Sequence, residues 1–442
     1  MTSIVLGGGV ALPLRYANRH GLVTGATGTG KTVTLQKLVE GFSNAGVPVF
    51  ASDVKGDLSG VASVQEGPSF PVAFWDLFAE DGLPIKTSVH EMGPLILSRL
   101  LGLNATQEGV LNIAFKWVAD PECPIHARLH TLDDLRAAVG EMMDHVDDIK
   151  TTYGNITAAS VGAIQRALLV LEGQGGSHLF GEPALDVNDF MRVDRYGRGT
   201  INLLSADQLM DSPKLYGAFL LWLLLQLFER LPEAGDLDKP KMVFFFDEAH
   251  LLFADASPVL METIERVVRL IRSKGVGVYF VTQHPLDVPG PILSQLGNRV
   301  QHALRAFTPR DRKAVRTAAE TFRQNPALNV QDVITQMGVG EALVSFLDHG
   351  GVPTMVERIK VNFPSAQVGP VDRFQRVAVI KADPLRVKYG RRFADDQEAY
   401  RAFIARVDAA ESASLSANEA APSWHDDDNE SATVSTTEGA TA

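Results

Sequence analysis

The sequence is poor in cysteine, with Cys123 the single one in 442 residues. One cysteine excludes an internal disulfide framework and any metal site built from several cysteines, and it fits a reducing compartment. Apolar runs are short: Gly217 to Phe228 is the longest, and crossing a bilayer takes about 20 residues. The N-terminal segment has no basic lead before its apolar residues, which argues against a secretory signal. We therefore expect a cytoplasmic protein that does not contact a membrane.

Basic residues are missing from the C-terminal end. Residues 408–442 carry eight acidic side chains and no Lys or Arg, against a formal net charge of −12 for the whole chain. Such a segment cannot bury enough apolar surface to offset the entropy of ordering it. The sequence predicts a disordered acidic tail. The alternative is that the tail competes with nucleic acid for a basic surface.

The rest of the chain alternates short apolar runs with amphipathic segments, which is typical of an α/β fold. Strands are expected at 20–24, 47–52, 199–204, 241–246, 276–281, 299–307 and 344–347. Helices are expected at 31–43, 106–118, 156–173, 213–230, 258–273, 310–321 and 397–409. A strand, a helix and a strand in quick succession imply a mainly parallel sheet. We expect a core in residues 1–89 and 196–407, a largely helical insertion at 90–195 and the tail at 408–442.

A glycine-rich turn follows the first strand. It matches the P-loop pattern GxxxxGKT, in the order Gly25, Ala26, Thr27, Gly28, Thr29, Gly30, Lys31, Thr32. The glycines let backbone N–H groups face a phosphate, and the following helix adds its positive N-terminal dipole. Lys31 can reach the β- and γ-phosphates, and the Thr32 hydroxyl can bind Mg²⁺. The sequence therefore predicts a nucleotide site.

Acidic residues follow the apolar strand expected at 241–246, in the segment MVFFFDE. This is the Walker B form, in which Asp247 would hold Mg²⁺ and Glu248 would polarise a water for attack on the γ-phosphate. The alternative is that both residues cap the next helix. The following strand ends at Gln283, whose amide can touch the γ-phosphate and the attacking water; otherwise it is a turn residue.

Asp53, Lys55, Gly56 and Asp57 follow the strand at 47–52. We expect this strand end to lie beside the P-loop, where its charged residues, Asp53 among them, would order the loop or contact Mg²⁺-bound water. A plain polar turn is the alternative.

These motifs together resemble the FtsK–HerA branch of P-loop ATPases. The resemblance rests on GATGTGKT, DVKGD, FFFDEAH, RSKGVGVYFVTQHPLDVP and LGNRVQHALRAFTP, and it covers about residues 1–410. Among the families of this branch, the chain is most similar to the HerA-like, YjgR-type ATPases. The resemblance implies a RecA-like P-loop NTPase fold, ATP hydrolysis with Mg²⁺ and, by analogy, DNA translocation by a homo-oligomeric, hexameric ring.

Ring ATPases of this kind complete each site with an arginine from the neighbouring subunit. Arg272 is the first candidate for this role and Arg299 the second. A basic stretch at 261–320 holds ten Lys or Arg and five acids, which suggests a surface that binds double-stranded DNA without reading its sequence. The alternative is a nucleotide-gated protein that binds or remodels a protein partner and has no DNA substrate.

Overall fold

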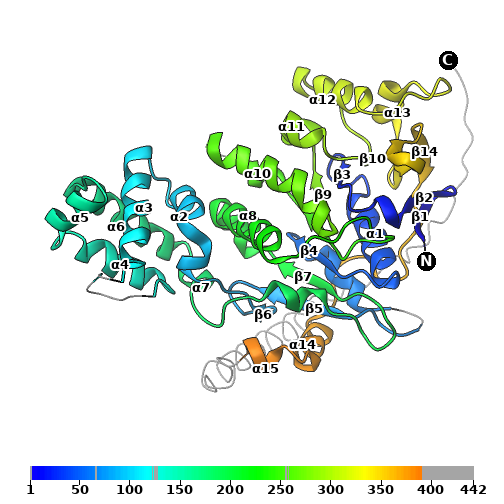
Figure 1. Ribbon diagram of the computed structural model, residues 1–442. Coiled ribbons are helices and arrows are strands. Elements are labelled where there is room, and N and C mark those ends of the chain that lie inside the picture. Colours follow the sequence, from blue (N-terminus) through cyan, green and yellow to red (C-terminus); the bar gives the residue numbers. More distant parts are fainter. Residues whose placement is uncertain are drawn as a thin grey trace, which may run out of the picture. The chain divides into compact units, whose positions relative to one another are not determined.

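The computed structural model describes residues 2–64, 67–121, 123, 128–253, 256 and 258–390 (Figure 1). The expected helix at 397–409 and the acidic tail at 408–442 lie outside these residues. Met1–Tyr389 form one compact unit, and the description below concerns this unit.

A ten-stranded sheet runs in the order β14–β11–β10–β3–β9–β8–β4–β7–β5–β6. Its strands are β3 (Gly21–Thr24), β4 (Val49–Asp53), β5 (Val72–Asp76), β6 (Leu83–Pro84), β7 (Ile201–Ser205), β8 (Met242–Phe246), β9 (Val276–Thr282), β10 (Asn298–Gln301), β11 (Glu341–Ser345) and β14 (Glu357–Lys360). The ladders from β10 to β6 are parallel, whereas β11 pairs antiparallel with β10 and β14. The prediction of a mainly parallel sheet is confirmed.

The strands read as continuous apolar runs because both faces of the sheet are covered. In β8, Met242, Phe244 and Phe246 enter one hydrophobic core. The alternating residues Val243 and Phe245 enter a second core on the other face. The five side chains of β8 are all fully buried, which places the residues that follow this strand firmly at the carboxyl edge.

Helices pack on both faces (Figure 1). The first core holds residues of α2 (Val89–Leu100), α8 (Pro213–Arg230) and α10 (Pro258–Leu270). In the second core, α1 (Lys31–Asn44) lies beside the hairpin of β1 (Ser3–Gly7) and β2 (Val10–Pro13). The shorter helices are α9 (His250–Phe253), α11 (Gly290–Leu293), α14 (Arg373–Ala382) and α15 (Arg386–Tyr389).

The segment between β6 and β7 is helical, as predicted. It contains α2, α3 (Ala105–Val118), α4 (Leu132–Glu141), α5 (Val146–Thr152), α6 (Ala158–Gly173) and α7 (Gly176–Leu179). The N-terminus of α3 is fixed by a capping box in which the Asn104 and Gln107 side chains each bind the other's backbone N–H. Helix α2 packs against both α3 and α8, so it joins the insertion to the helical layer that covers the sheet.

The strand expected at 299–307 is shorter than predicted, because β10 ends at Gln301. The chain then leaves the sheet, and Ala303 and Leu304 enter a third, small core with α12 (Pro309–Glu320) and α13 (Val330–Gln336). Phe307 is 86% exposed. The late strand expected at 344–347 is divided between β11 and a hairpin of β12 (Leu347–Asp348) and β13 (Val352–Pro353).

Residues 361–372 cross the surface of α1, a connection that the sequence did not predict. The buried carboxylate of Glu40 accepts hydrogen bonds from the backbone N–H of Ser365 and Ala366, both at 2.8 Å, and from the Ser365 hydroxyl at 2.9 Å.

Within the residues that the structure describes, no helix is long and apolar enough to cross a membrane.

Candidate nucleotide site

The P-loop connects β3 to α1 at the carboxyl edge of the sheet. Gly30 caps α1 with φ of 112°, in the region that favours glycine. A Cβ on Gly25 would lie 2.5 Å from the Cβ of His302, so a larger residue there would collide with the chain that leaves β10. The glycines at these two positions are therefore required by the shape of the loop.

The loop rests on residues that sequence reasoning missed. The Ala26 N–H donates to the Ala303 carbonyl at 2.9 Å, and the Thr29 carbonyl accepts from the Gly340 N–H at 3.0 Å. His302 links α1 to β11: its Nδ1 lies 2.9 Å from the carbonyl oxygen of the first residue of β11, and its Nε2 lies 2.8 Å from the Thr34 hydroxyl. Because a carbonyl only accepts, Nδ1 carries the proton and Nε2 accepts from Thr34.

Burial lowers the pKa of His302 to about 4, so this imidazole is neutral at physiological pH and acts as a fixed support. His302 lies within the segment LGNRVQHALRAFTP, but the sequence assigned it no role, because its partners lie on α1 and β11 and are distant in the chain.

Lys31 lies inside its own loop. Its Nζ donates to the carbonyls of Gly25 at 2.6 Å and Ala26 at 3.2 Å. Burial lowers the pKa of this ammonium, and the negative charges of Asp247 and Glu248 act in the opposite direction. The structure thus brings the predicted lysine and the predicted carboxylates into one electrostatic neighbourhood.

Asp247 and Glu248 follow β8, as the sequence predicted. Burial and the Glu248 charge raise the pKa of Asp247 to about 6, and the Glu248 N–H donates to Asp247 Oδ1 at 2.9 Å. Glu248 has φ of 46°, a left-handed conformation that costs a non-glycine residue on the order of 1–3 kcal/mol and is concentrated at functional sites.

The Glu248 carboxylate faces β9, the strand between β8 and β3. Its Oε1 lies 3.4 Å from the Gln283 amide nitrogen, and its Oε2 lies 3.4 Å from Nδ1 of His250. Oε2 is buried and accepts no hydrogen bond from the described residues. This leaves an acceptor for a donor such as water, as a candidate general base requires.

Asp53 does not lie next to the P-loop strand, because β9 and β8 separate β4 from β3. The expected neighbourhood is therefore corrected: Asp53 lies on the far side of Asp247 from the P-loop. Burial raises the pKa of Asp53 to about 7, while the Leu58 N–H and the charge of Arg376 lower it and the Asp247 charge raises it. Leu58 N–H donates to Asp53 Oδ2 at 3.1 Å.

A polar cleft of about 410 Å³ opens beside Asp53. Lys55, Ser59 and Arg376 are among its lining residues. Arg376 reaches it from α14, donates to the Ser205 hydroxyl at 2.9 Å and lies 4.6 Å from the ring centroid of Phe74. Arg376 thus contacts β5 and β7 while its charge acts on Asp53 at the end of β4.

The two arginine candidates have different environments. Arg272 lies exposed in the 3₁₀ turn Ile271–Lys274 before β9. Arg299 is half-buried, and its guanidinium donates to the carbonyls of Leu293 and Leu296, both at 3.1 Å. Both arginines lie at or near the amino-terminal ends of parallel strands, at the opposite edge from the P-loop of the same chain.

The residues at this edge fit a nucleotide with Mg²⁺. The described residues contain no group of three or more His, Cys, Asp or Glu side chains placed to hold a metal. Mg²⁺ commonly keeps several waters and uses one or two protein ligands plus substrate phosphates. Thr32, in the first turn of α1, and the half-buried Asp247 supply that kind of donor set.

The comparisons with known proteins agree with this architecture. A family model described as Helicase HerA-like C-terminal matches residues 5–69 and 64–441. No curated protein sequence gave a significant match.

Solved structures show the same fold at low identity. The bacterial conjugative coupling protein TrwBdeltaN70, in an unbound form, is 16% identical with a TM-score of 0.58, over 84% of this chain and 92% of that chain. A structure of TrwB in complex with ADP and Mg²⁺ has 15% identity, a TM-score of 0.58 and the same coverage. VirB4 of Thermoanaerobacter pseudethanolicus has 16% identity and a TM-score of 0.55, over 85% and 98% of the two chains.

Proposed function

The chain belongs to the family of helicase HerA-like C-terminal domains, and on this premise we propose that it is a Mg²⁺-dependent ATP hydrolase that translocates along or remodels DNA. One observation carries the hydrolase proposal. Lys31, Asp247 and the pair Glu248–Gln283 come from three different strand ends and meet at the carboxyl edge of β3, β9 and β8.

Each residue then has a role in the proposed reaction. The backbone of residues 25–30 and Lys31 would bind the phosphates, and Thr32 and Asp247 would hold Mg²⁺. The metal would neutralise charge on the phosphate oxygens. Glu248 would orient the attacking water and take up its proton, with Gln283 fixing the carboxylate from the neighbouring strand. Asp53 would act from beyond Asp247, through Mg²⁺-bound water.

Two substitutions test the hydrolase proposal. Lys31→Ala should abolish nucleotide binding, whereas Glu248→Gln should keep ATP bound and reduce turnover by about 100-fold or more, the usual weight of a general base. Glu262→Gln, on the exposed face of α10, removes the same charge and should leave turnover unchanged. A normal hydrolysis rate in Glu248→Gln would show that Glu248 is not the general base. Normal ATP binding by Lys31→Ala would refute the proposed nucleotide site.

The DNA part of the proposal is supported by the distribution of charge. Of the ten basic residues at 261–320, eight are exposed: Arg266, Arg269, Arg272, Arg305, Arg310, Arg312, Lys313 and Arg316. They lie on α10, the turn after it, α12 and the loop before α12, and α10 and α12 are joined through α11 and the turn at Pro285–Asp287. Phe307 is exposed within the same loop.

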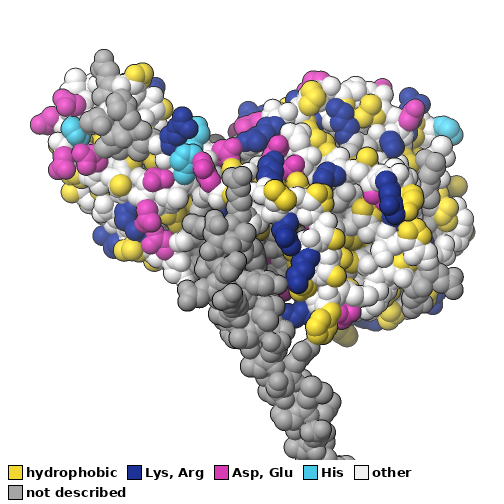
Figure 2. All heavy atoms as spheres, turned by 90° about the horizontal axis from the view of Figure 1, so that it is seen from below, with side chains coloured by type: hydrophobic (Ala, Val, Ile, Leu, Met, Phe, Trp, Pro, Cys, Tyr) yellow, Lys and Arg dark blue, Asp and Glu magenta, His cyan; other side chains and the backbone are white. Residues whose placement is uncertain are grey.

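The helical insertion has the opposite charge. The first turn of α4 contains Asp133 and Asp134, and the first turn of α5 contains Asp147 and Asp148. Figure 2 shows acidic side chains gathered over this part of the molecule. Phosphates would be repelled there, so the α10–α12 face is the favoured DNA contact. In a ring, the exposed Arg272 remains the first candidate for the arginine supplied to a neighbouring subunit.

The proposal that the protein acts on DNA can be tested by steady-state ATP hydrolysis. The rate is measured with and without double-stranded DNA, at two salt concentrations. DNA should raise the rate, and the effect should fade as salt rises, because phosphate contacts release counterions. Lys313→Ala with Arg316→Ala should weaken the stimulation, whereas Lys116→Ala with Lys150→Ala on the insertion should not. Hydrolysis that is indifferent to DNA would overturn the DNA proposal and direct the search to a protein substrate.

A further inference from the structure

The turn that carries Glu248 is held by two helices of the layer above the sheet. The Tyr216 hydroxyl, on α8, donates to the Asp247 carbonyl at 2.8 Å. The Arg99 guanidinium, near the end of α2, donates through Nη2 to the Leu251 carbonyl at 3.1 Å. These two carbonyls lie on either side of Glu248, whose backbone is in the left-handed region.

We propose that Tyr216 and Arg99 are positioning residues that fix the Glu248 carboxylate, and that through them the α2–α8 layer transmits movement of the helical insertion to ATP hydrolysis. This inference rests on the proposed hydrolase function. It adds a control point for that site which lies outside the P-loop and Walker B motifs.

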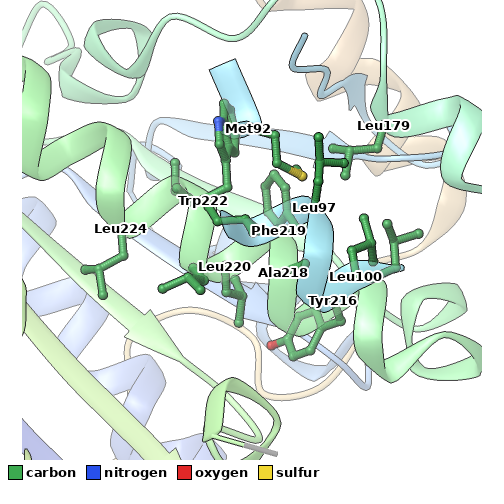
Figure 3. Packing of buried hydrophobic residues seen from close by; sticks show 14 of the residues in the cluster. Met92, Leu97, Leu100, Leu179, Tyr216, Ala218, Phe219, Leu220, Trp222 and Leu224 are labelled. Atoms are coloured by element: carbon green, nitrogen blue, oxygen red, sulfur yellow. The ribbon is translucent and has the colours of Figure 1, made fainter. Parts of the chain in front are cut away.

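Tyr216 is a rigid anchor for the turn. It is fully buried, and Figure 3 shows it at the edge of a cluster that includes Leu100 and Phe219, with its oxygen directed away from the apolar side chains. The backbone N–H of Asp247 donates to Ser52 Oγ at 3.0 Å, and that oxygen lies 2.8 Å from the Tyr216 hydroxyl. Both backbone polar groups of Asp247 are thus engaged, so the orientation of the residue is fixed from α8 and β4 together.

The helices also approach the turn too closely to move independently of it. A Cβ on Gly217 would lie 2.6 Å from the Leu251 carbonyl oxygen, so α8 and α9 are in direct backbone contact. Because packed interiors shift between discrete arrangements and do not deform smoothly, a displacement of α8 would carry the Asp247 and Leu251 carbonyls with it. The backbone of Glu248, which lies between these two carbonyls in the chain, would shift, and its carboxylate would change direction.

Helix α2 extends this connection to the insertion. It packs on α8 and on α3, and Met92 and Leu97 of α2 lie with Trp222 of α8 in the cluster of Figure 3. A partner that binds the insertion would therefore act on the catalytic turn through α2, by way of Arg99, and through α8, by way of Tyr216.

The first test compares two tyrosines. Tyr216→Phe keeps the ring in its packing and removes the hydroxyl, so kcat for ATP should fall about tenfold, the order expected for losing one hydrogen bond that positions a reacting group. KM should stay within about twofold, because the P-loop is not touched. Tyr279→Phe is the matched control: this tyrosine is also buried, and its hydroxyl donates to the Ala17 carbonyl at 3.0 Å on the other face of the sheet. It should leave kcat unchanged.

A second measurement does not depend on hydrolysis. Amide hydrogen exchange of a peptide covering residues 247–253 should rise in Tyr216→Phe and in Arg99→Met, and it should be unaltered in Tyr279→Phe. Equal effects of the two tyrosine substitutions on kcat, or unchanged exchange at 247–253 in both Tyr216→Phe and Arg99→Met, would overturn the proposal. A wild-type protein without ATPase activity would refute the proposed function. The exchange measurement would still show whether Tyr216 and Arg99 hold the turn that carries Glu248.

Discussion

Asp247→Asn should stabilise the nucleotide-free protein at pH 8 while abolishing its turnover. The Asp247 carboxylate is half-buried, and its desolvation, followed by the charge of Glu248, raises its pKa from the ordinary 3.8 to about 6. An ionised carboxylate at this position therefore destabilises the folded state. Asparagine has nearly the same shape, and its carbonyl oxygen can still accept the Glu248 N–H that lies 2.9 Å from Asp247 Oδ1.

The expected change in the free energy of unfolding follows from the raised pKa of Asp247. A rise of about two pKa units corresponds to roughly 3 kcal/mol, at about 1.4 kcal/mol per unit. Lys31 loses an attractive charge in the variant, which offsets part of the gain. We expect the free energy of unfolding to increase by about 1–3 kcal/mol.

The pKa values of Asp247 in the folded and unfolded states determine at which pH Asp247→Asn stabilises the protein. Below about pH 4 the carboxyl group is protonated in both folded and unfolded states, and it imposes no cost. Between about pH 4 and pH 6 the folded protein binds more protons at this group, so its stability falls as the pH rises. Above pH 6 the cost of Asp247 is constant, and the advantage of Asp247→Asn is therefore fully developed at pH 8.

Urea unfolding of both proteins at pH 5 and pH 8, without Mg²⁺ or nucleotide, measures this difference. Asp238→Asn, which removes a negative charge from an exposed side chain, is the control and should change stability little. A stabilisation that is equal at the two pH values, or a loss of stability at pH 8, would refute the reasoning. With Mg²⁺ and ADP present, the difference in stability between Asp247→Asn and the wild-type protein should be smaller, because the wild-type carboxylate then has a counter-charge.

Three further predictions concern the scaffold, and urea unfolding tests each of them. Gly60→Ala should destabilise by about 2 kcal/mol or more, because its Cβ would lie 2.1 Å from the Gly369 carbonyl oxygen, whereas Gly109→Ala, within a helix and with no neighbouring atom within 4 Å, should be neutral or slightly stabilising. Glu40→Ala removes the acceptor of three hydrogen bonds and should cost about 2–4 kcal/mol; an unchanged midpoint would contradict this. Arg299→Met should lower stability by about 1–3 kcal/mol through the carbonyls it leaves, and a loss of turnover at unchanged stability would instead favour its role as the arginine supplied to a neighbour.

The sequence predicted those parts of the fold that are encoded locally. The P-loop is a continuous pattern, and the buried strands appear as apolar runs because alternate residues enter two cores, as Val243 and Phe244 do. Asp247 and Gln283 could be assigned to strand ends for the same reason. The sheet order was beyond such reasoning, and Asp53 was accordingly placed beside the P-loop strand when β9 and β8 lie between them.

The supports of the site were missed because their partners are distant in sequence. Tyr216 occurs in an apolar helix and reads as a core residue; its hydroxyl acquires a role only when α8 packs over β8. His302 follows a strand, and its two hydrogen bonds join α1 to β11. The error in the length of β10 has the same origin, because residues that read as a strand leave the sheet to support the P-loop and to enter the third core.

The charged groups of the site are each in an unfavourable environment in the protein alone. Lys31 is desolvated and donates to carbonyls of its own loop, Asp247 is desolvated beside Glu248, and Glu248 has a left-handed backbone. Phosphate would supply the charge that Lys31 lacks, and a divalent cation the charge that Asp247 lacks. Neutralising one of these groups alone leaves the other desolvated charge unbalanced, so nucleotide and metal should bind with positive coupling. The destabilisation that Asp247 causes in the free protein is, on this argument, the same free energy that favours the loaded state.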